Sequence, residues 1–361
     1  MAKYKFNCVD LFAGAGGFSL AASNAGINVV AAVEWNPKAC ETYRHNLINN
    51  KKHVLYEEDI LQFKPQSLYR NHFSNGVGCD ILLGGPPCQG FSVHRLNDAG
   101  VDDPRNELLL RYFAFVKKLK PKVFLMENVP GLLWKRHEDF LNEFYKQGRK
   151  AKYKVYAPEV IDAQCYGVPQ RRKRVFILGV RNDIELDIVW PPKPTHGDEK
   201  AREVDPNLKP LVTASPIFRK RVLKSDNNNI HMKHGPELIV VFKKTPINGG
   251  SRKDSGRVLP CHKNHNGHKD VYGRIDPNKP GPTMTTACIN PSKGRFVHPT
   301  EHHGITLRHA ARFQTFPDDF VFKGGLIAAG EQIGNAVPVK LGEVLLTTIA
   351  AGLRKWSRKD A

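Results

Sequence analysis

The sequence predicts an α/β fold with a mostly parallel, helix-covered sheet and a second, smaller domain. Strand-like and helix-like segments alternate over residues 6–129, an order typical of parallel strands joined by crossover helices that cover both faces. Residues 181–280 lose this periodicity and contain scattered prolines, NNN and GG. We therefore expect one domain at 1–182 and 329–361, and a second at 183–328, whose least periodic part is about 183–282.

Each element of the sheet domain has its own signal. Short apolar runs predict strands, and amphipathic spacing predicts helices. The expected strands are 6–12, 28–35, 54–60, 79–85, 122–129 and 174–180, and the expected helices are 16–26, 36–47 and 106–120. The segment IGNAVPVKLGEVLLTTIAAGLRKW (333–356) is expected to be helical and to pack on the sheet.

Composition narrows the class of protein. With 361 residues and 40% apolar content, the chain is long enough to bury a core and too apolar to be disordered. We expect no membrane span, because no run of 18 apolar residues occurs, and no signal peptide at MAKYKFNCVDLF. Seven scattered cysteines indicate reduced thiols in a cytoplasmic protein.

The net charge of +20 is unevenly distributed. Residues 1–100 carry +1, 101–180 carry +8, 181–280 carry +7 and 281–361 carry +4. A nearly neutral first part beside a basic remainder favours a small-molecule site next to a polyanion site. We therefore predict that the protein binds nucleic acid.

Glycines and acids lie at three predicted strand ends. DLFAGAGGFS places Gly14, Gly16 and Gly17 between a strand and a helix, where the backbone can approach a ligand closely. Glu34 stands where an acid usually binds ribose hydroxyls, and Trp35 could cover an adenine. Asp59 could accept from an adenine amino group. The turn alone also suits a nicotinamide or flavin site, and the acids could be solvated, but the missing G-x-G-x-x-G favours S-adenosylmethionine over a dinucleotide.

A single thiol follows the fourth predicted strand, in LLGGPPCQGFS (82–92). Prolines stiffen the chain immediately before Cys88. The residue could be an ordinary loop cysteine, or a nucleophile held at the end of a strand.

Several motifs then occur in a fixed order and carry a family resemblance. They are DLFAGAGGF, EWNPKAC, GGPPCQGFS, MENVPG, QRRKRVF, RHAARFQTFPDDF and GNAVPV. With these motifs the chain resembles the DNA cytosine-5 methyltransferases of the bacterial restriction-modification type. The resemblance implies a Rossmann-like, S-adenosylmethionine-dependent fold with S-adenosylhomocysteine as product. It also implies a double-stranded DNA substrate, a flipped-out cytosine, a monomer on DNA, and a possible restriction endonuclease acting on the same site.

The resemblance assigns catalytic roles. Cys88 resembles the nucleophile that adds to carbon 6 of cytosine, and Glu127 resembles the acid that contacts nitrogen 3 and the exocyclic amine. Arg172 and Arg174 match the family's Q-x-R-x-R. One of them would hold the pyrimidine oxygen and the other Glu127 or a phosphate. Alternation along a strand would place both arginines on one face.

The resemblance also implies binding residues. Those expected at the cofactor are Phe12, Gly14, Gly16, Gly17, Glu34, Trp35, Asp59, Ile60, Pro87, Leu108, Asn335 and Val337. Residues 89–105 resemble a loop that closes over DNA, with Ser92, His94, Arg95 and Arg105 as candidate contacts. Residues 183–282 would be the target-recognition region by position. No metal is expected, because CHKNHNGH (261–268) lacks a second cluster to complete four ligands.

Two departures and three rival functions stay open. His309 stands where the family usually has glutamate, in a segment expected to be scaffold, and Ala336 replaces a common serine. The rivals are a tRNA methyltransferase of the same fold, a catalytically inactive DNA-binding relative, and a nicotinamide oxidoreductase. The long basic middle region argues against the tRNA enzyme. The presence of Cys88 and Glu127 argues against the inactive relative, and the incomplete glycine motif argues against the oxidoreductase.

Overall fold

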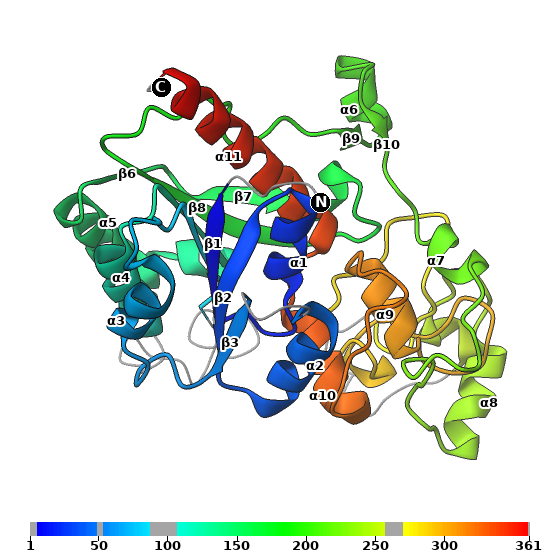
Figure 1. Cartoon of the computed structure of the whole chain (residues 1–361). Coiled ribbons are helices and arrows are strands. Elements are labelled where there is room, and N and C mark those ends of the chain that lie inside the picture. The colour runs from blue at the N-terminus through cyan, green and yellow to red at the C-terminus, as the bar shows by residue number, and fades with distance from the viewer. Residues whose placement is uncertain (1–5, 49–52, 87–106, 257–269, 360–361) are drawn as a thin grey trace. The chain divides into compact units, whose positions relative to one another are not determined.

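The computed structural model describes residues 6–48, 53–86, 107–256 and 270–359 (Figure 1). The chain divides into two compact units. Unit 1 contains Met1–Asp162, Lys173–Lys193 and Leu341–Ala361, and unit 2 contains Ala163–Arg172 and Pro194–Lys340.

The sequence predicts domain boundaries at 182/183 and 328/329, whereas the two units change at 193/194 and 340/341. Long-range contacts, which the periodicity of the sequence does not show, account for the difference. Residues up to Lys193 stay in unit 1, where Leu186 and Ile188 lie against Gly352. Residues 163–172 join unit 2, where Arg172 donates hydrogen bonds to carbonyl groups between residues 284 and 336.

A mixed eight-stranded sheet forms the centre of unit 1, in the order β3-β2-β1-β4-β5-β8-β6, with β7 also paired to β8. Its strands are β1 (Asn7–Leu11), β2 (Asn28–Glu34), β3 (Val54–Glu57), β4 (Ile81–Gly84), β5 (Val123–Asn128), β6 (Tyr153–Val155), β7 (Glu159–Asp162) and β8 (Lys173–Arg181). Strands β1 to β5 are parallel, which confirms the predicted fold class. Strand β8 is antiparallel to β5, so the end of β5 faces the beginning of β8.

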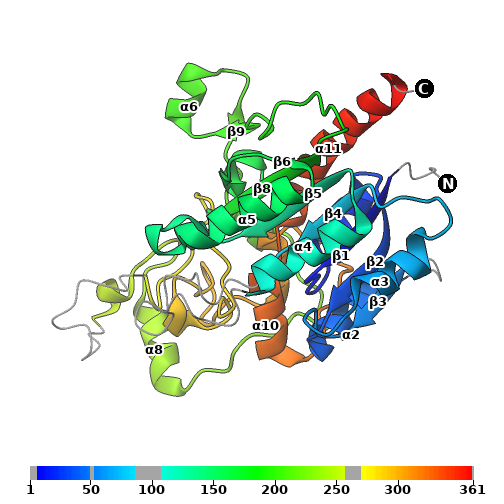
Figure 2. The same ribbon diagram turned by 90° about the vertical axis from the view of Figure 1, so that its left-hand side faces the viewer.

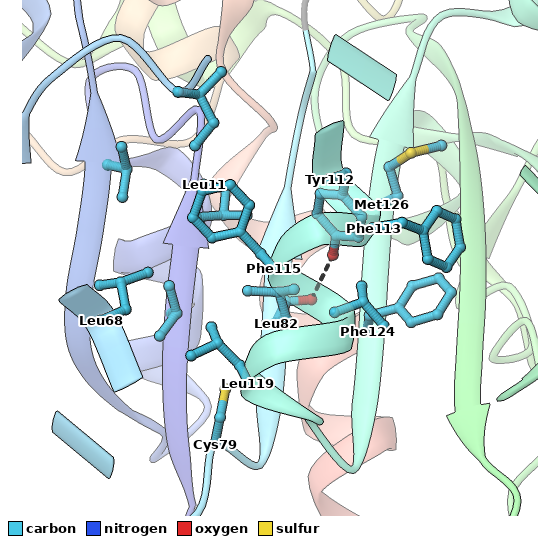
Figure 3. Packing of buried hydrophobic residues seen from close by; sticks show 14 of the residues in the cluster. Leu11, Leu68, Cys79, Leu82, Tyr112, Phe113, Phe115, Leu119, Phe124 and Met126 are labelled. Atoms are coloured by element: carbon cyan, nitrogen blue, oxygen red, sulfur yellow. Dashed lines mark hydrogen bonds between the residues drawn. The ribbon is translucent and has the colours of Figure 1, made fainter. Parts of the chain in front are cut away.

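Helices cover both faces of this sheet (Figures 1 and 2). One face carries α3 (Pro65–Leu68), α4 (Glu107–Leu119) and α5 (Glu138–Lys150), and the other carries α1 (Gly17–Asn24), α2 (Pro37–Leu47) and α11 (Val339–Lys359). Aromatic residues of α4 pack on β4 and β5, and the buried Tyr112 hydroxyl donates to the Leu82 carbonyl at 2.9 Å (Figure 3). Short helical turns η1 (Tyr69–Phe73), η4 (Pro130–Leu133) and η5 (Lys135–His137) complete the connections.

The C-terminal segment is helical but not continuous. Helix α10 (Gly325–Asn335) ends before Pro338, and α11 starts at Val339. Proline lacks the amide that a continuous helix would need. The stretch Gly325–Arg358 is long and apolar enough to cross a membrane by composition, but most of it is buried inside the protein. That burial, with Gly342 of α11 close to Ala21 of α1, is what a core helix shows.

Unit 2 has little regular structure among its described residues. Its elements are η6 (Ala163–Tyr166), β9 (His196–Gly197), α6 (Glu199–Val204), β10 (Lys209–Pro210), α7 (Ser215–Arg219), α8 (Pro236–Lys244), η7 (Arg252–Ser255), η9 (Pro291–Lys293), α9 (Leu307–Phe313) and α10. Strands β9 and β10 pair over two residues each. Buried arginines bond to many of the remaining backbone carbonyls, as Arg274 does to those of Phe242, Thr245 and His298.

Candidate active site

The turn after β1 is shaped by backbone conformations that favour glycine. Phe12, Gly14 and Gly16 have φ of 56°, 55° and 95°, a region that L-residues rarely adopt. A side chain on Gly16 would collide with Leu47, whereas one on Gly14 would meet nothing within 4 Å. The turn therefore packs tightly on one side and leaves open space beside Gly14. Gly17 begins α1 and is buried.

Glu34 organises the end of β2. Its carboxylate accepts from the amides of Gly14 at 2.8 Å, Trp35 at 3.0 Å and Asn36 at 2.8 Å. Burial raises the pKa of this carboxyl, while the three backbone donors act in the opposite direction. The adjacent Trp35 ring is 69% exposed. The role of this carboxylate and ring in binding a nucleoside stays a prediction.

The other expected cofactor residues of unit 1 that the structure describes, Asp59, Ile60 and Leu108, differ in how far they are exposed to solvent. Asp59 is exposed and its Oδ1 accepts from the Leu61 amide at 2.9 Å. Ile60 is buried in the core, so only its backbone could face a ligand, and its carbonyl accepts from Arg111. Leu108 is half-buried at the start of α4 and packs against the same core.

The acid expected in catalysis is held by an arginine. Glu127 lies near the end of β5 and is 8% exposed. Its Oε1 is 3.0 Å from Nε of Arg174, which stands in the neighbouring strand β8. This pairing resolves an alternative left open by the sequence, since Arg174 is the arginine that contacts Glu127.

The strand that leads to the predicted nucleophile lies beside Glu127. Gly84 at the end of β4 pairs with Met126 of β5. A side chain on Gly85 would begin 3.4 Å from Oε2 of Glu127, an ordinary contact distance, so the chain after β4 lies close to this carboxylate. The buried Asn128 donates to the Pro86 carbonyl at 3.3 Å and links the two strand ends. Pro87, Cys88, Ser92, His94, Arg95, Arg105 and the segment 261–268 lie outside the described residues.

Arg172 is not placed as the sequence predicts. Strand β8 begins only at Lys173, so Arg172 lies outside the alternation that would put both arginines on one face. Its side chain is fully buried in unit 2 and donates to the carbonyls of Met284, Gly334 and Ala336 at 2.7–3.0 Å. A guanidinium enclosed in this way supports local structure, and the geometry gives no support to direct contact with a substrate.

Unit 2 also contains the last expected cofactor residues and the departure at His309. Asn335 is exposed and Val337 is buried. His309 closes a capping box at the start of α9, where its amide donates to Thr306 Oγ1 and its Nδ1 accepts from the Thr306 amide. Because Nδ1 accepts the bond that a glutamate would accept there, the histidine preserves the cap.

Asp10 is a buried acid of unit 1 that the sequence prediction missed. Asp10 of β1 accepts from Ser19 Oγ at 2.6 Å, and Ser19 accepts in turn from the Tyr43 hydroxyl at 2.6 Å. Burial raises the pKa of Asp10 to about 7. A carboxylate inside the apolar strand NCVDL was the available signal. The bonds tie β1, α1 and α2 together beneath the glycine turn.

The described residues thus define a class of protein. A parallel sheet with a glycine turn after β1, an acid at the end of β2 and further polar groups at the ends of β4 and β5 is the arrangement of Rossmann-like nucleotide-cofactor enzymes. Comparison with known proteins identifies the family within that class. Residues 6–351 match the family described as C-5 cytosine-specific DNA methylase.

Individual relatives agree with this match. The chain is 32% identical to Type II methyltransferase M1.HphI of Haemophilus parahaemolyticus, covering 97% of this chain and 89% of that protein. It is 34% identical to Type II methyltransferase M.NgoFVII of Neisseria gonorrhoeae, over 91% and 82%. A crystal structure described as a prophage-encoded DNA modification methyltransferase of Escherichia coli superposes with a TM-score of 0.72 at 25% identity, covering 98% and 100%. The chain belongs to the C-5 cytosine-specific DNA methylase family and is an enzyme that methylates cytosine in DNA.

Proposed function

We propose that unit 1 carries out the reaction with Cys88 as nucleophile, Glu127 as the acid at nitrogen 3 of a flipped-out cytosine, and Arg174 as the group that orients Glu127. The observation that carries this proposal is the 3.0 Å ion pair of Glu127 and Arg174, beside the strand whose continuation contains Cys88. The target base must leave the duplex, because carbon 6 is inaccessible within the base stack.

The chemistry explains these residue types. Addition of the Cys88 thiolate to carbon 6 forms a carbon–sulfur bond and makes carbon 5 nucleophilic. Glu127 supplies a proton toward nitrogen 3 as negative charge develops on the ring. The pair with Arg174 through Oε1 fixes the carboxyl group, and the backbone at Gly85 lies close to Oε2. Once carbon 5 has gained the methyl group that the cofactor would supply, loss of the carbon 5 proton to solvent, return of the nitrogen 3 proton to Glu127 and departure of sulfur from carbon 6 restore the aromatic ring and the thiolate.

The residues of unit 1 suit S-adenosylmethionine as cofactor. The open space beside Gly14 and the fixed carboxylate of Glu34 fit an adenosine with a short tail. When bound, this cofactor supplies an electrophilic methyl group. Glu34 and Trp35 would hold its ribose and adenine, with Asp59 at the adenine amino group, while Asn335 and Val337 remain the residues expected at the methionine end.

We further propose that unit 2 selects the DNA sequence and that the enzyme acts as a monomer in the bacterial cytoplasm, on nucleoid DNA. Two relatives are Type II methyltransferases, which supports a role as the modification partner of a restriction endonuclease acting on the same site. No metal participates in this proposal. No cluster of three or more metal-ligating side chains occurs within the ranges that the structure describes.

A trapping experiment tests the mechanism. Duplex DNA containing 5-fluorocytosine at the target should form an adduct with the enzyme in the presence of S-adenosylmethionine, because fluorine cannot leave as a proton does. The adduct should survive denaturing electrophoresis, and mass spectrometry should place it on Cys88. Cys88→Ala should abolish it, while the matched Cys165→Ala should retain it. An adduct on another cysteine, or full activity in Cys88→Ala, would contradict the proposal.

A further inference from the structure

The connection between helices α10 and α11 is enclosed by buried polar side chains of unit 2. This connection, Asn335–Pro338, is here called the elbow. Asn335 is exposed, whereas Gly334 and Ala336 on either side of it are buried. The carbonyls of Gly334 and Ala336 both accept from the Arg172 guanidinium, at 2.8 and 3.0 Å. One fully buried side chain thus fixes the backbone on both sides of an exposed asparagine.

Gln314 also bonds to the backbone around the elbow. Arg172, Gln314 and Gln170, whose side chains surround the elbow, are here called the frame. Nε2 of Gln314 donates to the carbonyls of Ile333 at 2.5 Å and Ala336 at 2.9 Å, and the side chain is 0% exposed. The last carbonyls of a helix lack intrahelical partners, and cations are favoured at this end of the helix dipole. Gln314 and Arg172 therefore provide what the C-terminus of α10 requires.

Gln314 and its neighbour Thr315 also bond to the start of α11. The Val339 amide donates to the Gln314 carbonyl at 3.0 Å, and the Lys340 amide donates to Thr315 Oγ1 at 2.9 Å. The first amides of a helix likewise lack intrahelical partners. Residues 314 and 315 thus bind the end of one helix and the beginning of the next, which fixes the angle of the elbow.

Three further hydrogen bonds join Gln170, Arg172, Gln314 and Met284. Gln170 donates to Gln314 Oε1 at 2.7 Å and accepts from the Met284 amide at 2.8 Å, while Arg172 donates to the Met284 carbonyl at 2.7 Å. Gly334 permits this approach, because a side chain there would begin 2.2 Å from the Thr285 carbonyl carbon. Three segments distant in sequence, 170–172, 284–285 and 314–315, therefore meet around the elbow.

We infer that Arg172, Gln314 and Gln170 are positioning residues that hold the elbow in one conformation, so that Asn335 is preorganised to contact S-adenosylmethionine. The inference rests on the proposed role of Asn335 at the cofactor. It assigns Arg172 an indirect function in place of contact with the base. A frame of this kind lowers the ordering cost of binding, because the backbone around Asn335 does not have to be fixed when the cofactor arrives.

The test separates positioning from stability. Gln314→Met preserves volume and removes the side-chain bonds to the carbonyls of Ile333 and Ala336, and Arg172→Lys removes the forked donor geometry of the guanidinium. Arg274→Lys is the matched control, because Arg274 is equally buried in unit 2 and bonds to carbonyls of Phe242, Thr245 and His298 instead. Each variant is measured for melting temperature, calorimetric Kd for S-adenosylmethionine, KM for DNA and kcat.

We expect Gln314→Met and Arg172→Lys to weaken S-adenosylmethionine binding about tenfold, with KM for DNA within about twofold of wild type, since the frame acts on cofactor residues. Arg274→Lys should lower the melting temperature without changing the cofactor Kd. If Arg172→Lys does not fold, Gln314→Met carries the test. An unchanged cofactor Kd in Gln314→Met would overturn the inference.

A double-mutant cycle distinguishes failure of this inference from failure of the proposed function. If Gln314 acts through Asn335, Gln314→Met should have little further effect on cofactor Kd in an Asn335→Ala background. Full additivity of the two losses would overturn the inference while leaving the cofactor role of Asn335 intact. Wild-type protein that does not bind S-adenosylmethionine would instead overturn the proposed cofactor.

Discussion

Units 1 and 2 satisfy their backbone hydrogen bonds in different ways. In unit 1 most strands pair in a ladder, and side chains at the strand ends remain available for chemistry. In the described part of unit 2, guanidinium groups replace the ladder, as Arg274 bonds to four carbonyls and Arg312 to those of Ile217, Lys220 and Arg221. A buried arginine is therefore a structural element here, in the way that a strand pair is in unit 1.

The comparison changes how the charge of the sequence is interpreted. Arg172, Arg274 and Arg308 are fully buried, so they add to the net charge but not to the exposed basic surface. Residues 194–213 have a net charge of −1, whereas residues 214–256 carry +6. The exposed basic side chains of the latter range are Arg219, Lys220, Arg221, Lys224, Lys233, Lys243, Lys244 and Lys253. Within 183–282, we therefore expect phosphate contacts in residues 214–256 and not in residues 194–213.

The largest expected effect tests the chemistry of unit 1. Glu127→Gln removes the transferable proton and the charge partner of Arg174. We expect the single-turnover methylation rate to fall about 10²–10⁴-fold, the usual contribution of general acid–base catalysis. The melting temperature should fall as well, because the pair is nearly buried between two interior strands and the substitution leaves Arg174 without its charge partner. Activity within tenfold of wild type would remove Glu127 from the mechanism.

The next effect tests the structural arginines of unit 2. Arg274→Met leaves several buried carbonyls without their donor, and each costs about 1–3 kcal/mol. We expect urea unfolding to show a loss of about 2–5 kcal/mol, limited by relaxation of the surrounding backbone. The exposed Lys253→Met in the same unit is the control and should change stability by less than about 0.5 kcal/mol. Equal losses in both would refute a structural role for Arg274.

Glu34 tests the polar end of a strand in unit 1. Glu34→Ala removes the acceptor of three backbone amides and the proposed ribose ligand. We expect calorimetric affinity for S-adenosylmethionine to weaken by about 1–3 kcal/mol. Glu34→Gln keeps one acceptor oxygen and should lose less. An unchanged affinity in Glu34→Ala would show that this strand end does not bind the cofactor.

The lysines of α8 sharpen the distinction between exposed and buried cations. Lys243 and Lys244 are exposed at the end of this helix. Their double substitution by alanine should reduce the slope of log K against log salt by about 2, if each neutralises one phosphate. Lys150→Ala, on the exposed surface of α5 in unit 1, should leave the slope unchanged. Filter-binding titrations over a salt series would distinguish the two.

The smallest effect is a difference in pH dependence. Burial lowers the pKa of His298 and His309 in unit 2 to about 3, so the unfolded chain binds more protons below the ordinary histidine pKa. Their contribution to stability is complete above about pH 6.5 and is lost as the pH falls toward 3. His309→Gln, which can still close the cap, should reduce the slope of unfolding free energy in this range by up to about 1.4 kcal/mol per pH unit.

Asp10 of unit 1 has the opposite dependence. Its folded pKa is raised to about 7, so the unfolded chain binds fewer protons, and stability is lost as the pH rises from about 4 toward 7. Urea titrations of wild type, His309→Gln and Asp10→Asn across pH 4–8 would measure both trends. An acid-side slope in His309→Gln equal to that of wild type would contradict the contribution of His309.

The parallel strands β1 to β5, the strand ends that carry Gly14, Glu34 and Glu127, and the family could be predicted from the residues alone, whereas β6, β7 and the antiparallel pairing of β8 were not. Parallel strands bury both faces, so their apolar runs and the polar residues that end them are visible without the fold. The fold was needed to show that Arg174 pairs with Glu127, whereas Arg172, two residues earlier, is buried and bonds to the backbone around the elbow. Both are arginines of one motif, and their environments are created by segments up to residue 336. Long-range side-chain bonds leave no local pattern, so the sequence could predict that these arginines matter but not what each one contacts.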